Sequence, residues 1–379
     1  MPTPTTTNPV SIVPAPLAQP DIDALISLVK WGGPLGSGVQ LTYSFPWEGG
    51  AASWFAGYGG AAYSLVSENT AAQHFGLDAQ QQAAFRSALQ VWSNVANVVF
   101  AQVPDNATSA GDIRVGFSTA VPAGTWGWAY FPKGDWPNGG DIWISPQAAA
   151  GAGDWSAGSY NYLSLIHELG HALGLKHPFA DGPVLPDAQD NLRDTVMSYT
   201  EPDNLLYVSV ERDGSRYSLS AFNVQPTTPM VLDIAAIQYL YGANMTYRTG
   251  DDIYTFDRAT PILQALWDAG GDDTISVANF SRGCEIDLRP GHYSVVYVAS
   301  DAIPGVHWED PPPVPTYDGS PNLGIAFGCD IENAIVYSGL HAIWSYRLAH
   351  RLWAKPAGRG PARVLSQFTR FLTGIEIHP

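Results

Sequence analysis

Near its middle the chain reads His167-Glu-Leu-Gly-His-Ala-Leu-Gly-Leu-Lys-His177, and this stretch decides how the rest is interpreted. On a helix, His167 and His171 lie four residues apart, so both imidazoles project from one face and can bind one metal ion. Gly174 can adopt the left-handed conformation that ends a helix, and the turn brings His177 back as a third ligand. Three neutral nitrogens with one open position are typical of a catalytic zinc site.

Glu168 lies one residue from His167, so it can reach a water on that metal without binding the metal itself. Zinc lowers the pKa of such a water to roughly 7, and a carboxylate that takes its proton contributes about 10²–10⁴-fold to the rate. The alternative is a helix with two surface histidines. The glycine and the third histidine at these spacings argue against it, and we expect a zinc hydrolase.

Composition narrows the classes of function. The 379 residues carry a formal net charge of −17, which argues against nucleic acid as a partner. No apolar run is long enough to cross a bilayer. No Lys or Arg precedes Lys30, so the chain lacks an N-terminal secretory signal and is either cytoplasmic or exported by another route. The only cysteines, Cys284 and Cys329, form no disulfide framework.

Apolar periodicity and turn residues predict an α+β fold, a mixed twisted sheet packed under long helices. The tryptophans Trp126 and Trp128 either line a groove beside an edge strand that binds a substrate backbone or are ordinary sheet packing. Thr227 or Thr228 is the expected N-cap of the last helix. The predicted elements are a short helix at 21–29, a helix after Asp78, the zinc helix at 161–173, a helix at 230–241, and strands at 38–45, 97–103, 112–118, 124–131 and 141–145.

The zinc stretch, followed by Met197-Ser-Tyr199, resembles the metzincin metalloproteases, and His177-Pro178 points to the serralysins among them. The similarity continues through residues 229–245 and ends near Ile335. It implies a secreted, extracellular bacterial endopeptidase that acts on protein or peptide substrates, is made as a zymogen and leaves by type I export. His167, His171 and His177 would be the zinc ligands and Glu168 the base. We expect a monomer without stable membrane association.

Tyr199 would be the auxiliary zinc ligand or a second donor to the oxyanion, with Met197 as an apolar floor beneath the metal. Taken singly, each is as well explained by packing. The same resemblance implies several structural calcium ions in two acidic, glycine-rich turns, although solvated turns look alike. The implied ligands are the carbonyls of Arg248, Gly250, Gly270 and Gly271, the carboxylates of Asp252, Asp268 and Asp273, and a further site at Asp330 and Glu332.

These features divide the chain into a propeptide or disordered lead (1–30), a metzincin catalytic domain (31–245), a β-rich calcium-binding domain (246–335) and a divergent basic tail (336–379). Serralysins continue into Gly-Gly-x-Gly-x-Asp repeats that wind a β-roll, and this chain has none. Residues 334–379 carry six basic residues against one acid, a charge of +5, which leaves −22 for the remainder. The tail is a divergent domain end, a basic amphipathic segment or, as we favour, the product of a frameshift.

Two rival functions stay open at this point. One is a calcium-dependent binding or adhesion protein with an inactive protease-like site, and the other is a zinc hydrolase of small amides. The first has no need of Glu168 and would cleave nothing. A comparison of casein with short acyl-amides separates the second from an endopeptidase.

Overall fold

The structure is a computed structural model. It describes residues 3–4, 9–13, 19–50, 52–54, 62–133, 138–147, 153–280, 283–336, 338–355 and 359–373.

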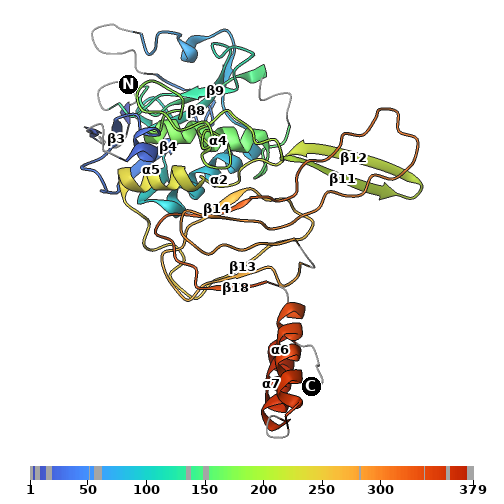
Figure 1. Ribbon diagram of the computed structural model, residues 1–379. Coiled ribbons are helices and arrows are strands. Elements are labelled where there is room, and N and C mark those ends of the chain that lie inside the picture. Colours follow the sequence, from blue (N-terminus) through green and yellow to red (C-terminus); the bar gives the residue numbers. More distant parts are fainter. Residues whose placement is uncertain are drawn as a thin grey trace.

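A mixed six-stranded sheet forms the upper part of the molecule (Figure 1), and its path runs β6–β4–β8–β10–β9. The first four strands on this path pair in parallel, whereas β9 pairs antiparallel with β10 and forms the edge of the path. The strands are β4 (Val39–Ser44), β6 (Val98–Gln102), β8 (Ile113–Ser118), β9 (Gly127–Ala129) and β10 (Ile142–Ile144), with β5 (His74–Phe75) paired to β8. All of β8 and β10 is buried, as expected for parallel strands covered on both faces.

Three helices pack around this sheet: α2 (Ala79–Val95), α4 (Tyr160–Leu173) and α5 (Val231–Tyr241). Helix α2 begins with a capping box, because Asp78 accepts from the Gln81 backbone N–H and the Gln81 side chain accepts from that of Asp78. Trp92 on α2 is fully buried and donates from Nε1 to the Ile166 carbonyl of α4 at 3.1 Å. Helix α4, which carries the zinc stretch, is therefore held in the core.

The second part of the chain is built of short strands below α5 (Figure 1). One three-stranded sheet is parallel and contains β13 (Ile253–Thr255), β15 (Thr274–Ser276) and β18 (Asn333–Ile335). The other contains β14 (Gln264–Leu266), β17 (Leu323–Ile325) and β16 (Tyr293–Ser294). Leu323, Ile325 and Ile275 are fully buried between these elements. These short strands make the second part of the chain rich in β-structure.

Two further elements extend from the body of the molecule (Figure 1). Strands β11 (Leu206–Asp213) and β12 (Arg216–Asn223) form a long antiparallel hairpin that the sequence analysis did not predict. Helices α6 (Ser338–Trp353) and α7 (Arg359–Thr373) pack on each other as a hairpin beyond β18. None of the helices in the described residues is long and apolar enough to cross a membrane.

Near the N-terminus the structure differs from expectation. The predicted helix at 21–29 shrinks to α1 (Pro20–Asp23), and β3 (Val29–Trp31) follows and pairs with β2 (Val10–Ile12). Ala24, Leu25 and Ile26 are fully buried, and the Lys176 N–H donates to the Leu25 carbonyl at 2.7 Å. Residues 20–30 therefore pack on the turn after α4, and the expected boundary at residue 30 divides residues that share one core.

Three smaller elements complete the description. Strands β1 (Thr3–Pro4) and β7 (Ser109–Ala110) pair in parallel, and η2 (Glu68–Thr70) is a single 3₁₀ turn.

The N-cap of α5 is Met230 rather than a threonine, and the Asp233 carboxylate accepts from the Met230 backbone N–H at 2.8 Å. The Asp233 side chain thus makes the N3-to-N-cap half of a capping box, and the expectation of a threonine N-cap was wrong.

Candidate metal centre

Helix α4 ends at a position that only glycine fits. Gly174 has φ of +106°, and a Cβ there would lie 2.4 Å from the Val29 carbonyl oxygen. The left-handed residue turns the chain, and the Leu175 N–H closes the helix by donating to the Gly170 carbonyl at 2.8 Å. The turn therefore directs residues 175–177 back across the helix.

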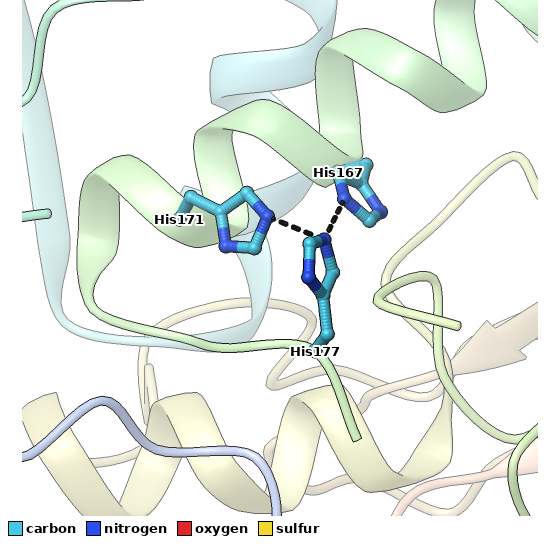
Figure 2. A group of neighbouring side chains, drawn as sticks. All are labelled: His167, His171 and His177. Carbon is cyan, nitrogen blue, oxygen red and sulfur yellow. Dashed lines mark hydrogen bonds between the residues drawn. The ribbon is translucent and has the colours of Figure 1, made fainter. Parts of the chain in front are cut away.

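The turn brings three imidazoles together (Figure 2). The Nε2 atom of His177 lies 3.1 Å from that of His167 and 3.0 Å from that of His171. The opposite ring nitrogens are engaged by backbone, since His167 Nδ1 lies 2.7 Å from the Val196 carbonyl and His171 Nδ1 lies 2.8 Å from the Leu175 carbonyl. Each Nδ1 must donate its proton to the carbonyl, which leaves the Nε2 lone pairs of both rings directed at the common centre.

The charge state of these rings also suits a metal ion. Burial lowers the pKa of His167 and of His177 to about 4, and it lowers the pKa of His171 well below its usual value. The rings are therefore neutral at physiological pH, and the Nε2 lone pairs of His167 and His171 both face Nε2 of His177 at contact distance. A cation that accepts all three resolves this arrangement, and three imidazoles with an open side match zinc.

Glu168 lies beside the three histidines and is buried. Its Oε2 atom has no hydrogen-bond partner among the described residues. Burial raises the pKa of this carboxyl to about 8, and the backbone N–H of Ala129 on β9 opposes the rise. A buried carboxylate with one unpartnered oxygen is an energetically costly arrangement, and it is common where the group exchanges a proton during a reaction.

Met197 lies beneath the site, where it is fully buried. A Cβ on Gly170 would lie only 2.5 Å from Met197 Sδ, so the first glycine of the zinc stretch leaves room for this side chain. The turn that carries Met197 is fixed by Asp233, whose Oδ2 atom accepts from the Val196 N–H at 2.7 Å. Because the Val196 carbonyl accepts from His167, Asp233 also fixes one imidazole through the backbone.

Tyr199 lies at the open side of the site. Its hydroxyl is 2.9 Å from His177 Nε2, its ring stacks on that of His167 at 5.6 Å, and two thirds of the residue is exposed. The hydroxyl can therefore reach the metal position and also a substrate above it.

A cleft of about 430 Å³ adjoins the histidines. Trp126 lines it and is anchored by a hydrogen bond from Nε1 to Asn161 Oδ1 of α4 at 2.8 Å. Trp128 is not among the lining residues, because its Nε1 donates to Glu68 at 3.0 Å. Of the two predicted groove tryptophans, one lines the cleft and the other packs away from it. The lining residues are Gly124, Thr125, Trp126, Gly127, Tyr160, Leu163, Ser164, His167, Glu168, Leu192, Val196, Ser198, Tyr199 and Glu201.

Comparison with known proteins agrees with this geometry. The Matrixin family model matches residues 60–204, and the model of the peptidase M10 serralysin C-terminal domain matches residues 234–301. The chain is 31% identical over 306 residues to a serralysin of Proteus mirabilis, which covers 70% of this chain and 55% of that protein. The chain belongs to the serralysin-type metzincins. These families are zinc-dependent, and the serralysin C-terminal domain is calcium-binding.

Other serralysins have similar sequence identity to this chain and similar coverage. Serralysin C of Dickeya chrysanthemi is 31% identical over 299 residues, which cover 73% of this chain and 55% of that protein. Serralysin G of the same organism is 34% identical over 234 residues, 55% of this chain and 46% of that protein. The chain spans about half the length of the curated relatives it matches.

The second part of this serralysin contains a cluster of three carboxylates. Oxygens of Asp252, Asp268 and Asp273 lie within 4.8 Å of one another, and in the part of the chain that the structure describes Asp273 Oδ2 is buried without a hydrogen-bond partner. A Cβ on Gly271 would lie 2.3 Å from the Gly250 carbonyl oxygen, so the two predicted turns touch here. Like charges at this separation, together with an unpartnered buried oxygen, fit a hard divalent cation such as calcium.

Of the remaining predicted calcium ligands, some lie at the aspartate cluster and one does not. The Arg248 carbonyl accepts from the Ala269 N–H at 3.2 Å, and its guanidinium lies 3.3 Å from Asp252 Oδ1. Gly270 donates its N–H to Asp268 Oδ1 at 2.9 Å. Glu332 reaches the cluster of three aspartates, because its Oε2 atom accepts from the Asp273 N–H at 2.7 Å. Asp330 is exposed, and among the described residues it joins no group of three metal-ligating side chains.

Sequence reasoning missed two residues that shape the site. Asp233 holds the Met197 turn, and Asn161 holds Trp126 at the cleft. Asp233 could have been recognised as an acid in the first turn of the predicted helix, where capping is common. Asn161 carries no such local signal, since its partner lies 35 residues away in the chain.

Proposed function

We propose that this serralysin-type chain is a zinc endopeptidase that hydrolyses peptide bonds in extended protein segments. The observation that carries the proposal is the convergence of three neutral Nε2 atoms beside the unpartnered oxygen of Glu168. His167, His171 and His177 would hold the metal. Zinc bound there supplies a Lewis acid and a water acidic enough to ionise near neutral pH.

The side chains around the metal position divide the chemical work. Glu168 takes a proton from the attacking water through its unpartnered oxygen and delivers it to the leaving amine, which is general base and general acid catalysis by one group. The Tyr199 hydroxyl donates a hydrogen bond to the oxyanion that develops at the scissile carbonyl. The exposed position of Tyr199 leaves the ring free to move towards the substrate.

Strand β9 would bind the substrate backbone. Tyr130 exchanges backbone hydrogen bonds with the β10 side, donating to the Asp141 carbonyl and accepting from the Gly140 N–H. Because successive residues of a strand point their N–H and C=O groups to opposite edges, those of Ala129 and Gly127 point to the free edge of β9. Gly127 lines the cleft. An extended peptide can add to this edge as a further strand. Leu163, Leu192 and Val196 in the cleft favour an apolar side chain next to the cut.

Calcium would bind Asp252, Asp268 and Asp273 and join the two turns that start the second part of the chain. The Gly250 and Gly271 contact allows backbone carbonyls to complete the six to eight oxygens that calcium takes. Glu332 would join this site rather than form a second one with Asp330. We propose a catalytic domain over residues 31–245 that also includes the buried residues before 31, and a calcium-binding domain over 246–335.

Secretion, zymogen processing and type I export are proposals that rest on the family alone. The basic segment 336–379 includes the α6–α7 hairpin. Translation of the coding DNA in all frames tests whether a frameshift produced this segment, because a frameshift would leave the Gly-Gly-x-Gly-x-Asp repeats in another frame.

The test is cleavage of casein by the purified chain with zinc and calcium, with each metal alone, and with neither. We expect turnover only where zinc is present, with calcium prolonging activity. No cleavage in any mixture would contradict the proposal, and it would favour a binding protein if calcium-dependent partner binding persisted.

A further inference from the structure

A buried carboxylate holds the end of strand β9 from outside the six-stranded sheet. Glu68 on the η2 turn is fully buried, and its Oε1 atom accepts from Trp128 Nε1 at 3.0 Å and from the Tyr130 hydroxyl at 2.5 Å. Ser64 donates its hydroxyl to the other oxygen. Glu68 therefore accepts three hydrogen bonds, and two of them come from a single short strand and the residue after it.

The two donors flank the residue whose backbone N–H faces Glu168. Trp128 and Tyr130 are two residues apart, so their side chains project from one face, and Ala129 lies between them. The backbone groups of Trp126 and Tyr130 are hydrogen-bonded on the β10 side, and those of Ala129 point to the free edge. On that edge the Ala129 N–H faces Glu168. Helix α4 packs directly against β9.

Strand β9 needs such support, because it is only three residues long and has a partner on one side. A short edge strand with one neighbour bends easily unless its side chains are fixed. Trp126 ties its beginning to Asn161 on α4, whereas Trp128 and Tyr130 tie its end to Glu68. Its position between α4 and η2 is thus set by hydrogen bonds of side chains from both directions.

We infer that Glu68 is a positioning residue for the proposed hydrolysis, which holds the cleft-facing edge of β9 at the place where substrate backbone and Glu168 meet. The inference rests on the proposed function. It requires an acceptor at Oε1 rather than a negative charge. Glutamine supplies the same acceptor, and its amide can donate to Ser64, so Glu68→Gln should preserve the arrangement. Alanine removes it and leaves the donors of Trp128 and Tyr130 buried without a partner.

The first experiment compares three enzymes on an internally quenched peptide of about eight residues, long enough to pair along β9. For Glu68→Ala we expect kcat/KM to fall roughly 10–100-fold, as for other residues that hold a catalytic group in place. Glu68→Gln should stay within about threefold of wild type, and zinc content and the affinity for acetohydroxamate, which needs only the metal site, should not change in either variant. Wild-type kcat/KM in Glu68→Ala would overturn the inference, as would equal losses for peptide and acetohydroxamate.

A second readout is independent of activity. Hydrogen exchange of the segment 127–130 should accelerate in Glu68→Ala and stay slow in Glu68→Gln, with and without zinc. Unchanged exchange in the alanine variant would contradict the inference.

A matched pair keeps the test valid if Glu68→Ala does not fold. Tyr130→Phe removes one donor to Glu68, and Tyr63→Phe removes a buried hydroxyl of the same aromatic cluster that bonds Asp141 and Trp143 instead. We expect a several-fold loss of kcat/KM only for Tyr130→Phe, and equal kinetics of the pair would overturn the inference. A wild-type chain that cleaves neither casein nor the peptide would instead refute the proposed function.

Discussion

The molecule contains two clusters of metal-ligating side chains, and they are assembled in different ways. The three histidines come from eleven consecutive residues of one helix and its turn. The three aspartates come from two turns and lie up to 21 residues apart in the chain, and the turns meet because β13 and β15 pair in register. The histidine cluster is therefore fixed by local geometry, and the acidic cluster depends on the fold of the second part.

The clusters also differ in charge. The imidazoles are neutral, and backbone carbonyls fix both helix rings from outside. The carboxylates repel one another, and burial and the neighbouring acids raise the pKa of Asp273 above its usual value. We expect that the first site keeps its shape without metal, whereas the second requires a cation to be stable.

The largest effect should follow from Glu168→Gln. The variant keeps all three imidazoles and should bind zinc with the wild-type stoichiometry, because glutamine has nearly the same volume. Without a proton acceptor, casein hydrolysis should fall by about 10²–10⁴-fold or more. Metal analysis and casein turnover measure the two quantities, and activity near the wild-type rate would remove Glu168 from the mechanism.

Removal of calcium should affect stability more than it affects the chemical step. At a free calcium concentration about 100-fold above Kd, one site contributes about 2.7 kcal/mol, so chelation should lower the unfolding temperature by several degrees. Asp273→Asn should reproduce most of this loss. Asp310→Asn, an exposed acid outside the cluster, is the control. Equal shifts in both variants would show that general charge, not a calcium site, is responsible.

The packing beneath the zinc site is tested by Gly170→Ala. The added Cβ would lie 2.5 Å from Met197 Sδ, so the Met side chain must move or the helix must shift. Overpacking of this kind costs about 1–3 kcal/mol. Gly49→Ala, where a Cβ meets nothing within 4 Å, serves as the control. Urea unfolding of both variants gives the difference, and an equal stability would mean that Met197 relaxes freely.

Tyr199→Phe should give the smallest change. The ring and its stacking on His167 remain, and only the hydroxyl is lost. We expect kcat to fall about tenfold, or ~1.4 kcal/mol in the barrier, with KM nearly unchanged, since the hydroxyl acts mainly in the transition state. An increase in KM with constant kcat would assign Tyr199 to substrate binding.

The sequence predicted the features that are encoded locally. The helix before Gly174, the capping box at Asp78 and the strand positions in the sheet all follow from spacing and turn residues, and the structure confirms them within a few residues. The hairpin β11–β12 could also have been predicted. The two-residue loop Gly214-Ser215 lies between two β-strand-like segments, and Gly-Ser at this position is a hairpin signal.

Other features depend on partners far apart in the chain. Residues 24–29 have helical periodicity, but Ile26 forms a bridge with Leu175, and this tertiary pairing outweighs the local preference. Glu68 carries no local sign of its role, because Trp128 and Tyr130 lie about 60 residues away. Only the folded sheet brings these three side chains together.

The packing of residues 24–31 on the turn after α4 has a consequence for any shortening of the N-terminus. Lys30 is fully buried, and its amine donates to the carbonyls of Trp31 and Gly33 at 2.8 and 2.9 Å. Trimming of the N-terminus as far as residue 30 would remove Leu25, Ile26 and this lysine from the finished enzyme. We expect any processing protease to cut upstream of α1, so that the product keeps the segment that braces the turn carrying His177.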